Sequence, residues 1–420
     1  MNLDLSKIKS VFCIGIGGIG ISALAQMFKS RGALVSGVND DEGDTVNLLR
    51  NLGIQVTFLK DFKNLPEANL YVYSDAWLYR GPEIIENAKK TGKPVLSYFE
   101  ALGEIAKNYK VIAISGTHGK TTTTAMVAGI LTDAGLDPTV IVGSFVKKFG
   151  SNFRSGKGEY LVVEADEYNR HMLVFNPYIG LVTNIEADHL DVYKDLHDIQ
   201  NAFREFLNKS ENKITDYAKY LKKVPKLSVP GEHNRMNAAA ALAVAEVLNI
   251  KEEIAQKSLA EFSGTWRRLE KRAVTEKGTI IYDDYAHHPT EIRASIEALR
   301  ELYPKEEKNL TILFQPHLYS RTKALFSDFA KSFGGADRVL LLPIYYARES
   351  VDTTISSEKL AEAVAEEGEN VEAYPDFESA ERAVLSLNLG PKDVFVTMGA
   401  GEAYKVADKV FPDVKSGPRP

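Results

Sequence analysis

The clearest chemical signal in the sequence is the segment GTHGKTTT at residues 116–123, which directly follows an apolar run at 111–114. This is the pattern of a phosphate-binding loop: a buried strand, then a turn with glycines, then hydroxyl residues at the start of a helix. Glycine lets backbone N–H groups approach the phosphate oxygens, and the N-terminus of a helix favours an anion. The pattern places Lys120 on the β- and γ-phosphates of a nucleotide and the Thr121 hydroxyl on Mg²⁺. The alternative is an ordinary strand-to-helix turn, but a run of threonines forms helix poorly and needs another reason to be there.

Acidic residues and a histidine follow two later strands of the same segment. The strand at 161–163 runs into Glu164, and the strand at 179–185 runs into an acidic stretch that contains His189. Ligands of an open α/β sheet lie at the carboxyl ends of its strands, and carboxylate oxygens suit a Mg²⁺ that is shared with nucleotide phosphates. Glu164 is therefore a candidate magnesium ligand. His189 either ligates a second metal ion or pairs with a carboxylate. The alternative for both residues is that they are solvated loop residues. Farther on, His233 stands before an alanine-rich helix and could simply cap it.

The first hundred residues carry a second glycine-rich loop. GIGGIG at 15–20 lies between an apolar strand pattern at 11–14 and a helical run at 21–30. This is the order of strand, glycine loop and helix in a Rossmann-type nucleotide-binding unit. NAD binding would want an acidic residue at the end of the second strand. Asn39 stands there with two aspartates next to it, so the sequence leaves the kind of nucleotide open.

Histidine, aspartate, tyrosine and arginine also gather at strand ends in the last third of the chain. DDYAHHP follows the strand at 279–282, and QPHLYSRT follows the strand at 310–314. Strand and helix patterns alternate up to residue 401, which predicts a further doubly wound α/β unit. The adjacent histidines at 287–288 lack the spacing of a helical zinc site, so zinc is not expected there.

Composition narrows the class of protein further. The chain has 420 residues, 44% of them hydrophobic, and a net charge of −6, which predicts two or three domains and argues against nucleic acid or a membrane surface as partner. Its single cysteine, Cys13, lies in an apolar strand pattern and excludes an intramolecular disulfide framework or a thiolate zinc cluster. No apolar run is long enough to span a bilayer, and the N-terminus lacks the apolar core of a signal peptide. We therefore expect a cytoplasmic enzyme, with a disordered tail after Phe411.

Eight motifs in one order resemble those of the Mur ligases of bacterial peptidoglycan synthesis, from about residue 9 to about residue 404. They are GIGGIGIS (15–22), SGTHGKTTTT (115–124), EADE (164–167), TNIEADHLD (183–191), PGEHNRMNA (230–238), DDYAHHPTEI (283–292), FQPHLYSRT (314–322) and MGAG (398–401). The resemblance implies an α/β fold of three domains. These are a Rossmann-like UDP-sugar-binding domain at 1–107, a central P-loop ATPase domain at 108–264 and a C-terminal Rossmann-like, amino-acid-binding domain at 265–420.

The activity that the resemblance implies is ATP-driven ligation of L-alanine to the lactyl carboxylate of UDP-N-acetylmuramate through an acyl phosphate. FQPH followed by Arg321 resembles the alanine-adding branch, whereas DDYAHHP has a near counterpart in a branch that recycles a tripeptide, which stays the alternative. The implied partners are ATP, UDP-N-acetylmuramate and L-alanine, with Mg²⁺ as cofactor, and the implied state is a monomer or weak homodimer. A nucleotide-regulated binding protein without turnover also remains open. So does an NAD dehydrogenase, although that activity leaves the second phosphate loop unexplained.

The resemblance also assigns roles to residues of this chain. The catalytic residues are Lys120, Glu164 and His189, and the metal ligands are Thr121, Glu164 and His189. The ATP-binding residues are Gly116, Thr117, His118, Gly119, Lys120, Thr121, Thr122, His233, Asn237, Arg268 and Asp283. The UDP-sugar-binding residues are Gly15, Gly17, Gly18, Ile19, Gly20 and Ser74. The amino-acid pocket consists of Tyr285, His287, His317 and Arg321.

Departures from the family pattern qualify these assignments. Tyr168 and Asn169 replace a usual Ser-Asp pair, and Asn39 replaces an aspartate. Leu318 stands where an arginine is usual, so Arg321 is expected to carry more of the charge that holds the alanine carboxylate. The stretch between 191 and 230 is shorter than the family norm, which puts a small accessory sheet of the central domain in doubt.

Overall fold

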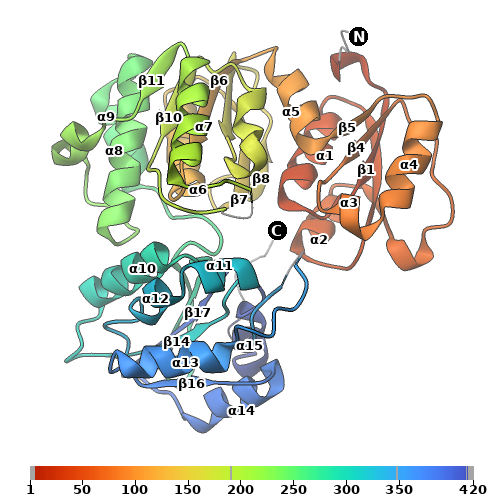
Figure 1. The fold of residues 1–420 in the computed structure, drawn as a ribbon. Coiled ribbons are helices and arrows are strands. Elements are labelled where there is room, and N and C mark those ends of the chain that lie inside the picture. Colours follow the sequence, from red (N-terminus) through yellow and green to blue (C-terminus); the bar gives the residue numbers. More distant parts are fainter. Residues whose placement is uncertain (1–4, 190–191, 347–348, 413, 415–420) are drawn as a thin grey trace.

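The computed structural model describes residues 5–189, 192–346, 349–412 and 414, and builds them into three α/β units, each on its own sheet (Figure 1). The first unit has a five-stranded parallel sheet in the order β3-β2-β1-β4-β5. Its strands are β1 Ser10–Ile14, β2 Leu34–Asn39, β3 Gln55–Phe58, β4 Leu70–Tyr73 and β5 Val95–Ser97. Its helices are α1 Ile19–Ser30, α2 Asp44–Asn51, α3 Trp77–Arg80, α4 Pro82–Lys90 and α5 Tyr98–Ala106.

Strand β1 shows why this sheet is parallel and covered on both faces. Successive side chains of a strand point to opposite faces, and here Phe12 and Ile14 enter one hydrophobic core while Val11 and Cys13 enter another. Cys13 is fully buried, as predicted, and burial raises the pKa of its thiol to about 12. The thiol therefore acts as a small apolar side chain.

The middle unit has a six-stranded sheet in the order β11-β10-β6-β9-β7-β8, in which β8 alone runs antiparallel to its neighbour. The strands are β6 Lys110–Ser115, β7 Thr139–Val146, β8 Ser151–Arg154, β9 Tyr160–Glu164, β10 Ile179–Val182 and β11 Asn212–Ile214. The helices are α6 Lys120–Asp133, α7 Leu196–Asn208, α8 Glu232–Val247 and α9 Glu252–Ala260. The described part of the chain contains three sheets, one in each unit, so no accessory sheet accompanies this one among those residues.

Helix α6 explains the threonine run of the phosphate loop. Thr121 to Leu131 are buried, because α6 packs against the sheet on one side and against α8 and α9 on the other. A helix buried all round takes small and apolar side chains on every face.

The C-terminal unit has a six-stranded sheet in the order β12-β13-β17-β14-β15-β16, parallel except for β12. The strands are β12 Glu270–Val274, β13 Ile280–Asp284, β14 Asn309–Phe314, β15 Arg338–Leu341, β16 Val371–Ala373 and β17 Asp393–Met398. The helices are α10 Pro289–Leu302, α11 Tyr319–Ala324, α12 Phe326–Ala330, α13 Ser357–Glu366, α14 Phe377–Ser386 and α15 Tyr404–Val410. The predicted disordered tail falls mostly outside the described residues, but Val414 is described and is buried against this unit's core.

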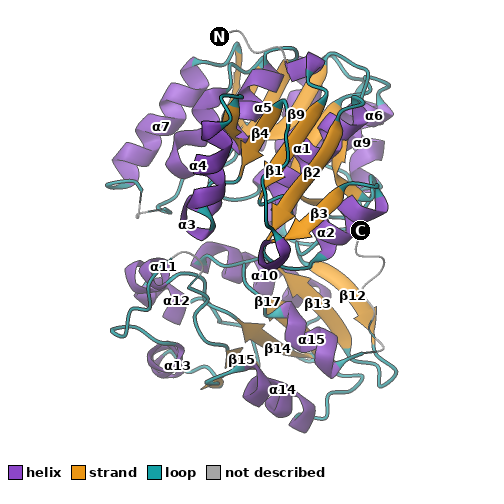
Figure 2. Cartoon of the chain, turned by 90° about the vertical axis from the view of Figure 1, so that its right-hand side faces the viewer, coloured by secondary structure: helices purple, strands orange, loops and turns teal. Residues whose placement is uncertain are grey.

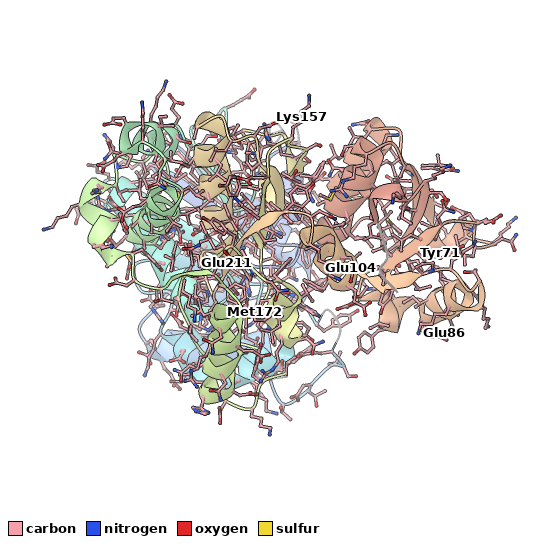
Figure 3. All side chains as sticks on the ribbon, turned by 90° about the horizontal axis from the view of Figure 1, so that it is seen from above. Tyr71, Glu86, Glu104, Lys157, Met172 and Glu211 are labelled. Atoms are coloured by element: carbon pink, nitrogen blue, oxygen red, sulfur yellow. The ribbon has the colours of Figure 1, made fainter. Side chains whose placement is uncertain are left out.

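Over the residues that the structure describes, the first and middle units share a hydrophobic core, whereas the C-terminal unit does not share one with either of them. One continuous core joins the first unit to the middle unit and contains, for example, Leu24 of α1 and Phe153 of β8. The C-terminal unit has two cores of its own and lies below the other two units (Figure 2). From above, Glu104 of α5 lies between the first unit, with Tyr71 and Glu86, and the middle unit, with Met172 and Glu211 (Figure 3). Among the described residues, no helix is both long and apolar enough to cross a membrane.

Candidate functional site

The phosphate loop has the geometry that its glycines predict. Gly116 and Gly119 have φ angles of +127° and +83°, in the region that favours glycine. A Cβ at Gly116 would come within 2.1 Å of Thr183 Oγ1, and one at Gly119 within 2.3 Å of Asn237 Oδ1. Helix α6 begins at Lys120, so its N-terminus faces the loop as an anion site requires.

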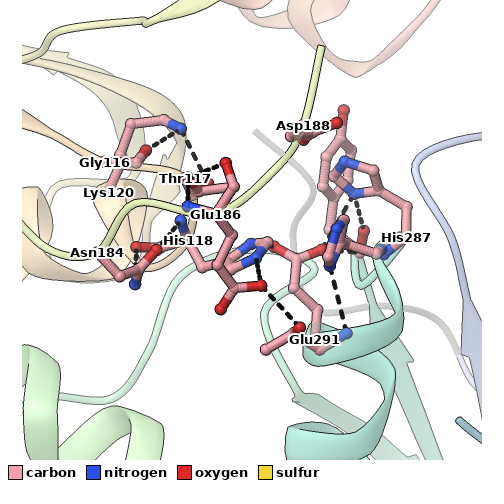
Figure 4. Close-up of polar contacts among 12 residues, drawn as sticks. Gly116, Thr117, His118, Lys120, Asn184, Glu186, Asp188, His287 and Glu291 are labelled. Carbon is pink, nitrogen blue, oxygen red and sulfur yellow. Dashed lines mark hydrogen bonds and ion pairs between the residues drawn. The ribbon is translucent and has the colours of Figure 1, made fainter. Parts of the chain in front are cut away.

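Lys120 is held at the mouth of this loop (Figure 4). Its Nζ donates to the Gly116 carbonyl at 2.6 Å and the Thr117 carbonyl at 3.1 Å, and lies 2.8 Å from the Glu167 carboxylate. Burial alone would lower the pKa of Lys120, but the Glu167 carboxylate raises it above its ordinary value. Lys120 is therefore a partly buried cation at the phosphate loop.

Thr121 and Glu164 bring two oxygen ligands together beside it. The Thr121 hydroxyl donates to Glu164 Oε2 at 3.1 Å, and the Gly143 N–H of β7 donates to Oε1 at 2.5 Å. Burial raises the pKa of Glu164, so the carboxylate gains from a positive neighbour. A hydroxyl and a carboxylate next to a phosphate loop form the kind of oxygen set that Mg²⁺ prefers.

His189 faces the same region from the loop after β10. Its Nε2 lies 3.5 Å from Glu167, and its buried Nδ1 has no hydrogen-bond partner. Burial alone would lower the pKa of His189, whereas the hydrogen bond that its ring donates to the Glu167 carboxylate raises it. The next two residues of the TNIEADHLD motif, Leu190 and Asp191, lie outside the described residues.

Two adjoining cavities run between the units, of about 420 and 270 Å³. The larger cavity is lined by residues of all three units. The first unit contributes Ile19, and the C-terminal unit contributes Tyr285 and His287. The middle unit contributes the predicted residues Thr117, Lys120, Thr121, Glu164 and His189. The smaller is lined by the predicted residues Thr122, His233 and Asn237, and His118, Gly119 and Arg268 line both. The structure thus brings the predicted catalytic residues and most of the predicted ATP-binding residues to one continuous cleft.

Two of the predicted ATP-binding residues, Gly116 and Asp283, line neither cavity. Gly116 lies in the phosphate loop itself, whereas Asp283 has its partners elsewhere. Its carboxylate pairs with Arg267 at 3.0 Å and accepts from Thr397 Oγ1 at 2.8 Å, inside the C-terminal unit. The neighbouring Asp284 lines the smaller cavity instead. Both lie on β13, where successive side chains point to opposite faces, so only one of the two aspartates can face the cleft.

A row of charged contacts, which we call the charged seam, joins the middle unit to the C-terminal unit. His118 lies 3.4 Å from Glu186 and 3.2 Å from Glu291, and Asp188 lies 3.0 Å from Arg321. Burial alone would lower the pKa of His118, but its hydrogen bonds to Glu186 and Glu291 raise it to about 9. Sequence alone does not single out Glu186, Asp188 or Glu291, although the first two lie in the acidic stretch around His189.

Arg321 has a different partner from the one predicted. Its Nε and Nη2 atoms donate to Asp188 at 3.1 and 3.0 Å, and its Nη1 lies 3.2 Å from His317 Nδ1. The planar guanidinium that was expected to hold the alanine carboxylate is therefore occupied by a carboxylate of the middle unit. Arg321, Asp188, His189 and the buried Leu318 line a hollow of about 160 Å³ beside the cleft.

His287 is the predicted pocket residue with the clearest chemistry. Its Nδ1 donates to the Tyr285 carbonyl at 2.9 Å, which leaves Nε2 with a lone pair. Burial lowers the pKa of His287 to about 4, so the ring is neutral at pH 7. A neutral imidazole in the cleft can accept a hydrogen bond from an amine.

The glycine loop of the first unit is held by a residue that departs from the family pattern. Asn39 Oδ1 accepts from the Gly17 N–H at 3.0 Å, so it ties the loop to the end of β2. Gly15 has φ +81°, and a Cβ there would come within 2.4 Å of the Trp77 ring. Ser74 follows β4 and donates its backbone N–H to the Ile14 carbonyl at 3.0 Å, next to the loop. Gly18 is the N-cap of α1, and Ile19 and Gly20 are the first two residues of that helix, so the six predicted UDP-sugar residues lie together.

The Tyr168 departure also lies at the cleft. The Tyr168 ring meets the His189 ring edge to face, with centroids 5.2 Å apart. Asn169, the next residue, has φ +50° in a 3-10 segment, Tyr168–Val174. Tyr168 therefore packs against a predicted catalytic histidine.

Comparisons with known proteins assign all three units of the chain to the same family. Three family models match it: "Mur ligase family, catalytic domain" at 10–110, "Mur ligase middle domain" at 114–221 and "Mur ligase, glutamate ligase domain" at 267–401. The UDP-N-acetylmuramate–L-alanine ligase of Caldanaerobacter subterraneus is 36% identical over 466 residues, covering 99% of this chain and 100% of that protein. The ligase of the same name from Caldicellulosiruptor saccharolyticus is 38% identical over 451 residues, covering 95% and 98%.

Solved structures give the same result. The UDP-N-acetylmuramate–alanine ligase of Thermotoga maritima has a TM-score of 0.82 and 26% identity, over 97% of this chain and 99% of that one. A murein peptide ligase of Psychrobacter arcticus has a TM-score of 0.70 at 21% identity, over 97% and 98%, which shows a shared fold.

Proposed function

We propose that the chain, which belongs to the Mur ligase family, joins L-alanine to the lactyl carboxylate of UDP-N-acetylmuramate as ATP is converted to ADP and phosphate. The observation that carries the proposal is the single cleft that Lys120, Glu164 and His189 line together with residues of all three units. The near full-length likeness to L-alanine ligases supports alanine as the amino acid.

The first step needs positive charge, because it brings a carboxylate to a triphosphate. The γ-phosphoryl group passes from ATP to the lactyl carboxylate, so that its bond to ADP breaks and an acyl phosphate forms. Lys120 exchanges its contact with Glu167 for the β- and γ-phosphates, and the protonated His118 and the guanidinium of Arg268 add charge on the other side. In a cleft with little water, such fixed charges stabilise the transition state far more than they would in solution.

A metal ion fits this scheme at Thr121 and Glu164. Their adjacent oxygens would hold Mg²⁺, which neutralises charge on the nucleotide phosphates when it is bound. His189, with its unpartnered Nδ1, would be a ligand of a second ion. His233 and Asn237 line the smaller cavity, which we assign to the base of ATP.

The second step forms the amide bond. The amine of L-alanine attacks the acyl carbon, a tetrahedral intermediate forms, phosphate leaves and the nitrogen loses a proton. His287 offers its free Nε2 lone pair to the amine and so orients the amine lone pair towards the acyl group. Tyr285 and His287 form the cleft wall, and His317 contacts Arg321 beside them. We propose that Arg321 acts through Asp188, which lies next to His189 in the chain.

The glycine loop and Ser74 are assigned to the UDP-sugar, with the pyrophosphate at the N-terminus of α1. ATP and sugar nucleotides are cytoplasmic metabolites, so we place the reaction in the cytoplasm. We propose a monomer or weak homodimer, because each cleft is complete within one chain.

Phosphate release tests the proposed function. Purified protein with ATP, Mg²⁺ and UDP-N-acetylmuramate should release phosphate when L-alanine is added and not when amino acid is left out, and each of the other standard amino acids is then compared with alanine. Lys120→Ala is the control for contaminating ATPase. Phosphate release with a free tripeptide but not with alanine would assign the recycling reaction instead, and release with neither would refute ligase activity.

A further inference from the structure

A fully buried set of neutral polar side chains joins α1 of the first unit to β8 of the middle unit. We call it the amide seam, and its members are Ser22, Gln26, Ser151 and Asn152. Gln26 Nε2 donates to Asn152 Oδ1 at 2.8 Å, and Ser151 Oγ donates to Gln26 Oε1 at 2.8 Å. Each amide thus has partners in the other unit, as buried amides require.

Asn152 directs its remaining donor at the first turn of α1. Its Nδ2 donates to the Ile19 carbonyl at 2.5 Å and to Ser22 Oγ at 3.0 Å, and Ser22 Oγ donates to the same carbonyl at 2.9 Å. Ile19 is the first residue of α1 and also lines the larger cavity. The contact therefore lies directly behind the N-terminus of the helix that follows the glycine loop.

The hairpin that carries Asn152 reaches the other end of the site as well. Strand β7 pairs with β8 and gives the Gly143 N–H to Glu164, beside the phosphate loop. One two-stranded element thus touches the glycine loop helix through Asn152 and the predicted magnesium ligand through Gly143. Such an element fixes the distance between the two phosphate-binding sites.

We propose that Asn152 is a positioning residue for the sugar nucleotide: through the Ile19 carbonyl it holds the first turn of α1, and with it the pyrophosphate site, in register with the nucleotide site. The proposal rests on the proposed function, since it takes UDP-N-acetylmuramate as the ligand of the glycine loop. Asn152 has no contact with substrate in this assignment and acts through the helix. Correct register matters because small displacements of a bound reactant lower rates steeply.

The test replaces Asn152 by leucine, which keeps the approximate size and removes the hydrogen bonds of the amide to Gln26, to the Ile19 carbonyl and to Ser22. The control is Asn212→Leu on β11, at the opposite edge of the same sheet, where the amide Nδ2 donates to the Tyr178 carbonyl at 2.9 Å. Calorimetry on the full-length protein should show the Kd for UDP-N-acetylmuramate about tenfold higher in Asn152→Leu, which corresponds to about 1.4 kcal/mol. The Kd for a non-hydrolysable ATP analogue should stay within about twofold of the wild type, and Asn212→Leu should leave both values unchanged.

A second variant covers the case in which Asn152→Leu does not fold. Ser22→Ala removes one of the two groups that hold the Ile19 carbonyl, and should raise the sugar-nucleotide Kd about threefold with ATP-analogue binding intact. An unchanged sugar-nucleotide Kd in a variant that still binds the ATP analogue would overturn the proposal, and so would an equal rise of both Kd values. A wild-type protein that binds no UDP-N-acetylmuramate would instead refute the proposed function.

Discussion

The two seams of this molecule are built from opposite kinds of contact. The amide seam between the first and middle units is neutral and fully buried, and it lies beside a hydrophobic core that both units share. The charged seam joins the middle and C-terminal units through the ion pairs His118–Glu291 and Asp188–Arg321. Within the described ranges, the C-terminal unit shares no hydrophobic core with the other two.

The difference between the two seams indicates which units can move relative to one another. Opening the amide seam would expose apolar surface and leave amide groups unpaired, which costs free energy for every group. Charges are well solvated by water, so the charged seam can open with less loss and can close again around anionic ligands. A charged contact between His171 and Asp75 also joins the first and middle units. We infer that the first two units form one body and that the C-terminal unit closes on it.

The largest expected effect comes from Lys120→Ala. Removing this cation from a cleft with little water should lower turnover by about 10²-fold or more. Because the sugar-nucleotide site is held by the amide seam and not by Lys120, calorimetry should give an unchanged Kd for UDP-N-acetylmuramate. Near-normal phosphate release by this variant would contradict the assignment of the phosphate loop. Weakened sugar-nucleotide binding would show that the ATP site and the sugar-nucleotide site are not independent.

Arg321→Lys tests the charged seam with the charge preserved. Lysine cannot make the paired contact with Asp188, and losing one hydrogen bond between charged groups costs about 1.5 kcal/mol, or about tenfold. We expect KM for ATP and for alanine to rise together by up to that factor, with KM for UDP-N-acetylmuramate unchanged. Arg382→Lys, in an exposed pair with Glu378, is the matched control.

The opposite outcome is equally informative. A rise in the alanine KM alone would mean that Arg321 leaves Asp188 and binds the alanine carboxylate, as the sequence predicts.

Local patterns in the sequence predict the backbone of the phosphate loop and most of the residues that line the cleft. The glycine positions and the strand before Lys120 predict the phosphate loop, because φ angles and helix starts are set by neighbouring residues. The three α/β units and the acidic residues at strand ends follow from the same local signals and from the family motifs.

Pairing between distant units could not be predicted in the same way. Asp188 and Arg321 are 133 residues apart, and nothing local marks them as partners. The choice between Asp283 and Asp284 fails for another reason, since every residue of β13 is buried and the burial pattern does not tell its two faces apart. The amide seam was missed because Gln26 and Asn152 look like ordinary polar residues until the units are packed together.

The pH dependence of stability should report on the charged seam. The pKa of His118 is raised to about 9 in the folded protein, from about 6.5 in the unfolded chain. The protonated ring therefore stabilises the folded state fully at pH values below about 6.5. This stabilisation is lost as the pH rises through 9. Its neighbours are the carboxylates of Glu186 and Glu291, which stay ionised over that range, and His288, whose pKa burial lowers.

The matched variant is His118→Gln. Wild type should melt about 4 °C above this variant at pH 7, and the difference should shrink towards zero at pH 10. The exposed His197→Gln is the control and should show no such trend. A difference that persists at pH 10 would mean that the charge on His118 does not stabilise the seam.

The smallest expected effect is a change in overall size. A chain of 420 residues has a radius of gyration of about 22 Å when compact, and small-angle scattering should detect a decrease of about 1 Å when a hinged unit closes. Since Lys120 and Asn237 lie on the middle unit and Arg268 belongs to the C-terminal side of the cleft, an ATP analogue contacts both sides and should cause this decrease. UDP-N-acetylmuramate alone binds, in our assignment, to the first unit at the fixed seam, so it should leave the radius unchanged. If the sugar nucleotide alone compacts the protein as much as the ATP analogue does, the first unit moves as well, and the amide seam is not the rigid joint that its buried hydrogen bonds indicate.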